Sequence, residues 1–107
     1  MSWSFWVDRK TRVVVRHRRA VPLTIVEFTI LDALHRRRGT ERRPHKAMLV
    51  RELVDEVYRG VSDPPANPHA SVNVIVGRIN AKLRHVMIRV RGRRRQRNST
   101  YQLEDYG

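Results

Sequence analysis

The pattern of hydrophobic and polar positions predicts three helices between two groups of short strands. Near the beginning of the chain, residues 3–7 and 12–17 predict two strands separated by a polar turn, because β-branched residues are enriched in strands. A third strand is predicted over residues 20–23, where Pro22 indicates an edge position because proline cannot donate a backbone hydrogen bond. These segments predict a small N-terminal antiparallel sheet.

The first helix has a clear start signal. Thr24 and Glu27 have the spacing of a capping box, in which each side chain bonds to a backbone N–H of the other residue. The helix is predicted to end near Arg37, before Gly39. Apolar residues recur at helical spacing, and they are Ile25, Phe28, Leu31 and Leu34, with Ile30 close to that face.

Two further helices and a hairpin follow a polar loop over residues 36–45. The second helix is predicted over residues 46–59 and the third over residues 70–84, with a rigid proline-rich connector between them. Residues 86–91 and 100–103 then predict a hairpin whose tip is formed by residues 92–98. This order predicts a single α+β domain over residues 1–107 with the winged helix-turn-helix fold, in which the hairpin is the wing.

The charge of the chain indicates a polyanionic partner. There are 23 Lys and Arg residues against 10 Asp and Glu, a formal net charge of +13, which favours nucleic acid or an anionic membrane surface. Residues 71–100 contain no acidic residue, whereas a surface that only keeps a protein soluble mixes both signs. The basic residues of this segment are Arg78, Lys82, Arg84, Arg89, Arg91, Arg93, Arg94, Arg95 and Arg97. A segment of one sign that spans a helix and a hairpin predicts contacts with phosphates.

One face of the third helix has the chemistry needed to read a major groove. Arg78 could bond to guanine O6 and N7, Asn73 could read adenine, and Val74 or Ile75 could touch thymine methyl groups. The alternative for Val74 and Ile75 is that they widen the buried face. The whole predicted contact face consists of Ser71, Asn73, Val74, Ile75, Arg78 and Lys82.

Gly77 lies in the middle of this helix, where glycine costs up to about 1 kcal/mol relative to alanine. Close packing on another helix, which we favour, or close approach to DNA would explain the glycine. The hairpin tip carries Arg93, Arg94, Arg95 and Arg97, and arginines on a flexible tip can enter a narrow minor groove. The alternative for the tip is a solvated run of charge.

Three segments in the same order resemble the winged-helix effector domain of OmpR/PhoB-type response regulators. Residues 23–34 (LTIVEFTILDAL) are similar to that family's LT-x-x-E-F-x-L-L-x-x-L motif, and residues 72–83 (VNVIVGRINAKL) are similar to its recognition helix. Residues 88–92 (IRVRG) and 101–103 (YQL) are similar to its wing. The resemblance implies that Arg78 is a main major-groove contact and that Arg91 reaches the minor groove from the wing.

The departures from the family pattern suggest an unusual target sequence. Asn73 and Ile75 replace an Asp and a His, Asn80 replaces an Arg, and Thr100 replaces a Gly. The resemblance also implies dimers or head-to-tail arrays on double-stranded DNA, and contact between RNA polymerase and the loop after the first helix. That loop is longer here and carries Arg36, Arg37, Arg38, Arg42 and Arg43. Because 107 residues leave no room for a receiver domain, we expect a stand-alone regulator without the usual phosphorylation control.

Other classes of function are less well supported. We expect no enzymatic activity, cofactor or metal site, because no nucleophile–base set is evident and the histidines (His17, His35, His45, His69 and His85) lack zinc-site spacing. The chain has no cysteine, no apolar run of roughly 18 residues and no signal peptide, so we expect a cytoplasmic, nucleoid-associated protein without membrane contact.

RNA binding is an alternative, but RNA modules usually stack bases on exposed aromatic rings, and most aromatic residues here fall in segments expected to pack. A protein adaptor that docks through Glu52, Asp55 and Glu56 of the second helix could coexist with DNA binding. The sequence therefore predicts a sequence-specific transcriptional regulator that binds double-stranded DNA.

Overall fold

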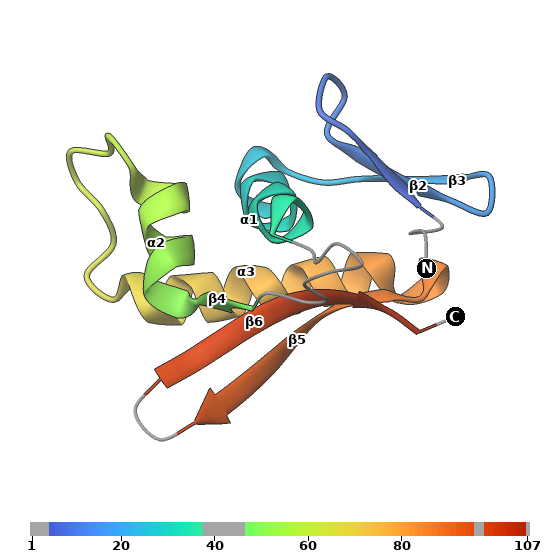
Figure 1. Ribbon diagram of the computed structural model, residues 1–107. Coiled ribbons are helices and arrows are strands. Elements are labelled where there is room, and N and C mark those ends of the chain that lie inside the picture. The colour runs from blue at the N-terminus through green and yellow to red at the C-terminus, as the bar shows by residue number, and fades with distance from the viewer. Residues whose placement is uncertain (1–4, 38–46, 96–97, 107) are drawn as a thin grey trace.

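The computed structural model describes residues 5–37, 47–95 and 98–106, and it has the predicted order of strands, three helices and hairpin (Figure 1). The elements are β1 (Trp6–Asp8), β2 (Val13–Arg16), β3 (Arg19–Pro22), α1 (Ile25–Arg36), β4 (Met48–Leu49), α2 (Val50–Tyr58), α3 (Pro68–Leu83), the 3-10 helix η1 (Arg84–Val86), β5 (Ile88–Arg95) and β6 (Asn98–Asp105). Residues 38–46, which include Arg38, Arg42, Arg43 and His45, lie outside the described residues, as do residues 3–4 of the first predicted strand.

The N-terminal sheet has the strand order β1-β2-β3 and is antiparallel throughout. Pro22 is in β3, which is an edge strand as predicted. A two-residue loop joins β2 to β3, because Arg16 pairs directly with Arg19. Leu23 then donates its N–H to the carbonyl of Arg12 at 3.0 Å, which leads the chain from the sheet into α1.

The capping box of α1 is present as predicted. The Glu27 N–H donates to Thr24 Oγ1 at 3.2 Å, and the Thr24 N–H donates to Glu27 Oε1 at 2.9 Å. The helix ends at Arg36, with Arg37 as its C-cap. Phe28 and the other predicted core residues of the helix are buried, but Ile25 is 64% exposed because it begins the helix ahead of the packed face.

The predicted start of the second helix at residue 46 is wrong. Met48 and Leu49 form β4, which pairs with β6 through Met48 and Tyr101, and α2 begins only at Val50. Glu52 supports this boundary because its Oε1 accepts the Leu49 N–H at 3.1 Å. Local sequence favours helix here, but an open edge of the distant β6 supplies backbone partners that turn these residues into a strand.

The third helix begins two residues earlier than predicted. Asn67 caps α3 by accepting the Ala70 N–H on Oδ1 at 3.1 Å, and Pro68 occupies the first helical position, where its missing N–H has no cost. At the other end α3 gives way to η1 at Arg84.

The wing is a longer and more regular hairpin than predicted. Paired backbone continues through Arg93↔Thr100 to Arg95↔Asn98, so Arg93, Arg94 and Arg95 belong to a strand and not to a flexible tip. The prediction failed because solvent-exposed strands need no hydrophobic residues, and an arginine run gives no strand signal. Arg97 lies outside the described residues.

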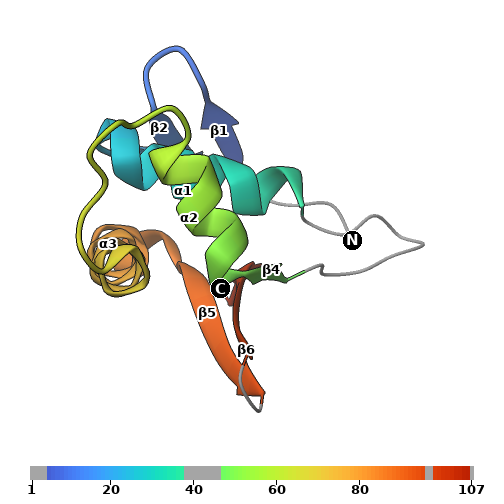
Figure 2. The same cartoon turned by 90° about the vertical axis from the view of Figure 1, so that its left-hand side faces the viewer.

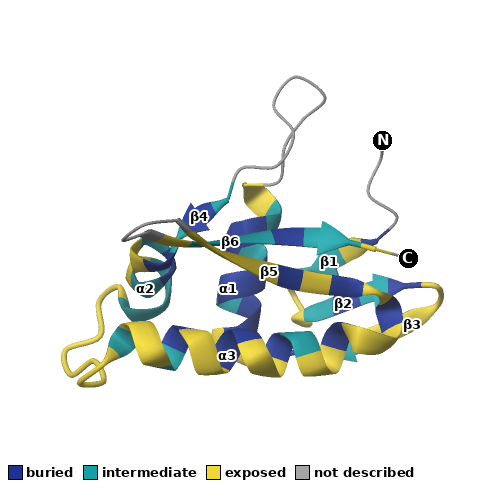
Figure 3. Cartoon of the chain, turned by 90° about the horizontal axis from the view of Figure 1, so that it is seen from below, coloured by how far each residue is buried: buried dark blue, intermediate teal, exposed yellow. Residues whose placement is uncertain are grey.

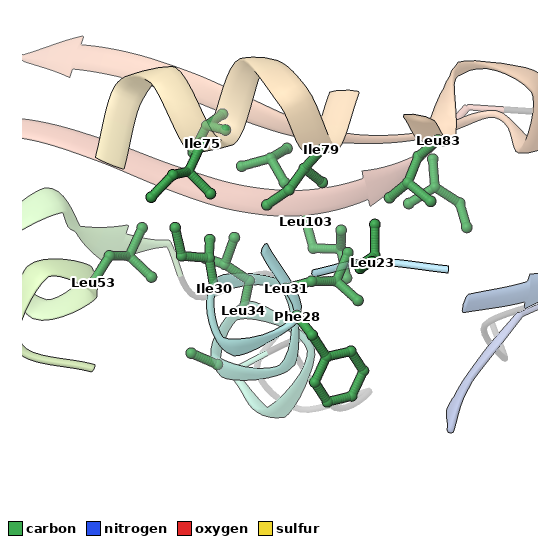
Figure 4. Close-up of a cluster of buried hydrophobic side chains, with 14 of the residues drawn as sticks. Leu23, Phe28, Ile30, Leu31, Leu34, Leu53, Ile75, Ile79, Leu83 and Leu103 are labelled. Carbon is green, nitrogen blue, oxygen red and sulfur yellow. The ribbon is translucent and has the colours of Figure 1, made fainter. Parts of the chain in front are cut away.

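The core lies around α1, which packs against α2, α3 and β6 (Figures 1 and 2). Val14 of the N-terminal sheet belongs to the same buried cluster. In Figure 4, side chains of α1 such as Leu31 face Ile79 of α3, Leu103 of β6 and Leu53 of α2. The predicted core residues of α3 (Val72, Val76, Ile79 and Leu83) are all buried. This packing fixes one face of α3 against the core and leaves its opposite face on the surface (Figure 3).

Candidate nucleic-acid interface

Exposed positions recur along the whole length of α3 and form a stripe on one side of the helix (Figure 3). Its exposed positions recur at alternating steps of three and one, and they are Ala70, Asn73, Val74, Gly77, Arg78, Ala81 and Lys82. Val74 is 56% exposed, as a thymine-contacting side chain would need to be. Ile75 is only 8% exposed and belongs to the core, so its predicted DNA contact is wrong because the helical repeat turns it toward Val72, Val76 and Ile79. Ser71 is half-buried and its hydroxyl donates to the Asn67 carbonyl at 3.3 Å.

Arg78 has an exposed side chain near the middle of this stripe. Within the described part of the chain, its guanidinium makes no hydrogen bond and no ion pair. An arginine offers five N–H donors in a planar fork, and here none of them is taken by a described residue. Arg78 is therefore available to an external acceptor without first breaking an internal contact.

Lys82, in contrast, is held by an internal partner. Its Nζ lies 2.6 Å from Oε1 of Glu27, which is 3% exposed. Burial alone would raise the pKa of Glu27, but the hydrogen bonds from Lys82 and from the Thr24 backbone, together with the positive charge of Lys82, lower it below the usual value. The first role of Lys82 is therefore to join the C-terminal part of α3 to the N-terminus of α1.

Two asparagines connect α3 to the wing. Asn80 donates from Nδ2 to the Val90 carbonyl at 3.1 Å and accepts the Val90 N–H on Oδ1 at 2.7 Å. The Tyr101 hydroxyl donates to Oδ1 of Asn73 at 2.6 Å. The Tyr101 ring lies against Gly92, where a Cβ atom would come within 2.9 Å of its Cε1 atom. These contacts orient the wing relative to the exposed stripe.

The cations of the wing differ in how far they are neutralised. Strand alternation places Arg89, Arg91 and Arg93 on one side of β5. Arg89 forms an ion pair with Glu104, and its guanidinium lies 4.8 Å from the ring centre of Tyr106. Arg91 Nη1 is 3.8 Å from the other oxygen of Glu104.

Beyond these pairs, the wing carries unneutralised charge. Arg93 and Arg94 are exposed, and neither has an ion pair among the described residues. The side chain of Arg95 lies outside the described part, as does Arg97. The free cations of the described wing are thus those nearest its tip.

Sequence reasoning missed the partners that hold this surface together. Glu27 and Glu104 lie outside the acid-free segment in sequence, yet the fold brings them onto Lys82, Arg89 and Arg91. The signal available for Glu27 was its role in the capping box, which places it at the N-terminus of α1. Nothing in the local sequence of Asn80 or Tyr101 indicated a bridge between helix and wing.

The acidic residues of α2 largely serve internal ion pairs. Glu52 Oε2 lies 2.7 Å from Arg37 Nη2, and Glu56 lies 3.6 Å from Arg36. Only Asp55 of the predicted adaptor surface is fully exposed. Among the described helices none is long and apolar enough to cross a membrane.

Comparisons with known proteins place the fold. No family model matches the chain, and no curated protein matches it. The structure is similar to the DNA-binding domain of the response regulator AdeR, solved as a crystal structure in complex with an intercistronic region. The alignment covers 99% of both chains with a TM-score of 0.66 and 19% sequence identity. The winged-helix fold predicted from the order of strands, helices and hairpin is therefore confirmed.

Proposed function

We propose that this protein is a sequence-specific transcriptional regulator that binds double-stranded DNA, with α3 in the major groove and the wing on the minor groove and backbone. The observation that carries the proposal is Arg78, an exposed arginine near the middle of the exposed stripe that has no internal partner in the described structure. The fold supports the proposal because the similar domain of AdeR was solved with a DNA region.

The stripe on α3 has the shape and chemistry of a base-reading surface. An α-helix fits the major groove, where arginine bonds to guanine O6 and N7 and apolar groups contact the thymine methyl. Arg78 and Val74 supply these two kinds of contact one helical turn apart. Gly77 lies between them and Ala81 lies just beyond Arg78; both have small side chains, which allows the helix surface to approach DNA closely.

The wing and Lys82 are proposed to bind mainly the DNA backbone. Arg93 and Arg94 need to break no internal ion pair in the described structure, so they should contribute more to phosphate or minor-groove binding than Arg89 and Arg91. Arg91 remains the minor-groove contact implied by the family resemblance, although Glu104 competes for it. Lys82 is 39% exposed while it is paired with Glu27, so it can face a phosphate only as part of that pair.

Selection of randomised duplex DNA by the purified protein, with single-stranded RNA as competitor, tests the proposal. We expect a defined motif, repeated about every 10 base pairs if copies bind one face of the duplex side by side. Arg78→Ala should weaken binding to that motif by about 1–3 kcal/mol and relax the preference at one base position. Arg59→Ala is the control, because Arg59 is an exposed arginine directly after α2 and away from the stripe; apart from its 4.0 Å ion pair with Glu56 it has no role in the proposal, and the variant should leave the motif unchanged.

Two results would contradict the proposal. Preferential capture by RNA would assign the protein to RNA binding. Salt-sensitive binding to duplex DNA without any motif would instead make it a non-specific DNA-binding protein.

A further inference from the structure

A second basic surface lies at the C-terminal end of α3, and neither the predicted stripe nor the wing includes it. We call it the turn patch, and it consists of His17, Arg18, Arg19, Arg84 and His85. All five residues are exposed, and none of them forms an ion pair within the described part of the chain. The patch joins two segments that are more than 60 residues apart in sequence.

Arg16 holds these two segments together. Its side chain is 3% exposed, and its Nη1 atom donates to the carbonyl oxygens of Val86 and Met87, each at 3.0 Å. The carboxylate of Asp105 lies 3.9 Å from its Nη2 atom. Because Arg16 is the last residue of β2, these bonds fix the β2–β3 turn beside η1, next to the end of α3 (Figure 1).

The composition of the turn is not explained by local stability. His17 and Arg18 form the two-residue loop, with φ angles of 54° and 62° in the left-handed region. Loops of this kind favour Asn-Gly or Asp-Gly, because other residues are strained there. Arg16 and Arg19 also face each other directly across the strand pair, where like charges are destabilising. Four consecutive basic residues therefore occupy a turn that disfavours them for two separate reasons.

The position of the patch relative to α3 points to the DNA backbone. The helix has 16 residues, so it is about 24 Å long, whereas the major groove is only about 12 Å wide. A helix centred in the groove at Arg78 therefore extends past the groove at its C-terminal end. Arg84 and His85 are exposed and follow the stripe in that region. The bonds of Arg16 to Val86 and Met87 bring the β2–β3 turn, which carries Arg18 and Arg19, to the same end of the helix.

We propose that the turn patch is a second phosphate-binding surface, which contacts the sugar-phosphate backbone beyond the groove read by α3. This inference rests on the proposed DNA-binding function. The contact would be independent of base sequence, because the patch meets phosphates and not base edges. It would lengthen the footprint of the protein on one side of its target site.

The N-terminal sheet provides a closely matched control at its other end. Lys10 and Arg12 lie at the β1–β2 turn, which projects away from α3 at the top of Figures 1 and 2. Both are exposed and have no ion pair among the described residues. The double variant K10A/R12A removes the same charge as R18A/R19A, and each variant replaces one residue of positive φ, since Arg12 has a φ of 56°.

The experiment measures the affinity of both double variants and the wild type for one selected duplex over a range of salt concentrations. R18A/R19A is expected to lower the slope of log affinity against log salt by about 0.9 for each phosphate that the variant no longer neutralises, and so by up to about 2. K10A/R12A should keep the wild-type slope. Thermal unfolding of all three proteins checks that both turns still fold.

The outcomes separate this inference from the proposed function. If the wild type binds its site and the two double variants have equal slopes, the turn patch does not bind phosphates, while the proposed function still stands. A wild type that binds no duplex DNA would overturn both. A reduced slope for R18A/R19A alone, with the selected base motif unchanged, would support a backbone contact.

Discussion

Replacing Gly77 by alanine is expected to stabilise the fold and to weaken DNA binding. Gly77 lies in the middle of α3 on its exposed side, and a Cβ atom placed on it would meet no atom within 4 Å. The packing explanation favoured from the sequence is therefore wrong. Because glycine costs about 0.8–1.0 kcal/mol relative to alanine inside a helix, Gly77→Ala should stabilise the protein by nearly that amount. For a domain of this size, that change raises the melting temperature by about 4 °C.

The effect on binding has the opposite sign. Gly77 precedes Arg78 and lies on the stripe that we place against the base edges. An added methyl group would hold the helix away from the DNA and lengthen the hydrogen bonds of Arg78. Since a bidentate arginine–guanine contact contributes about 1–3 kcal/mol, the loss should fall in the same range, and about 1.4 kcal/mol would be a tenfold weaker affinity.

Thermal unfolding and titration of a labelled duplex test both effects on the same protein samples. Ala81→Gly is the control, because it weakens the same helix by a similar amount without adding an atom to the stripe. It should lower the melting temperature and leave the affinity for DNA nearly unchanged. A Gly77→Ala protein that melts higher but binds DNA as well as the wild type would refute close approach at this position. A Gly77→Ala protein with a lower melting temperature than the wild type would show that the space around Gly77 is not open.

Two further predictions concern the contacts that support the interface. The pKa of Glu27 lies below its ordinary value of 4.5, so its ionised form stabilises the fold above pH 4.5 and this contribution is lost as the pH falls further. The Glu27→Gln variant should therefore have a lower melting temperature than the wild type at pH 7, and the difference between the two melting temperatures should become smaller below pH 4.5. A difference that stays constant with pH would contradict this. Asn80→Ala should lower the free energy of unfolding by about 1–3 kcal/mol, because the Val90 backbone loses both of its hydrogen bonds to Asn80. Denaturant unfolding measures this as a lower midpoint, and an unchanged midpoint would show that the bridge is dispensable.

The parts of the fold that could be predicted are those encoded by neighbouring residues. The start of α1 depends on Thr24 and Glu27, which are three residues apart, and both capping bonds form as predicted. The buried face of α3 follows from apolar spacing within one helix. The edge position of Pro22 follows from the chemistry of a single residue. In each case the information lies within one turn or one strand.

The parts that could not be predicted depend on partners far along the chain. β4 exists because Met48 meets Tyr101, more than 50 residues later. The wing extends through Arg93 and Arg94 because their backbone pairs with β6, although their side chains give no strand signal. The burial of Ile75 and exposure of Val74 were left open for the same reason, since only the packed neighbours decide which edge of a helix is covered.

The same long-range effect decides which cations are available for binding. An acid-free segment predicts a basic surface. In the folded chain, however, Glu27 and Glu104, which lie outside that segment in sequence, form ion pairs with Lys82, Arg89 and Arg91. The cations left unpaired in the described structure include Arg78 on the helix, Arg93 on the wing and the turn patch. Of that patch, sequence reasoning selected Arg84 but not Arg18 or Arg19. A count of charges therefore identifies the kind of partner, whereas the folded pairing of those charges identifies the residues that can meet it.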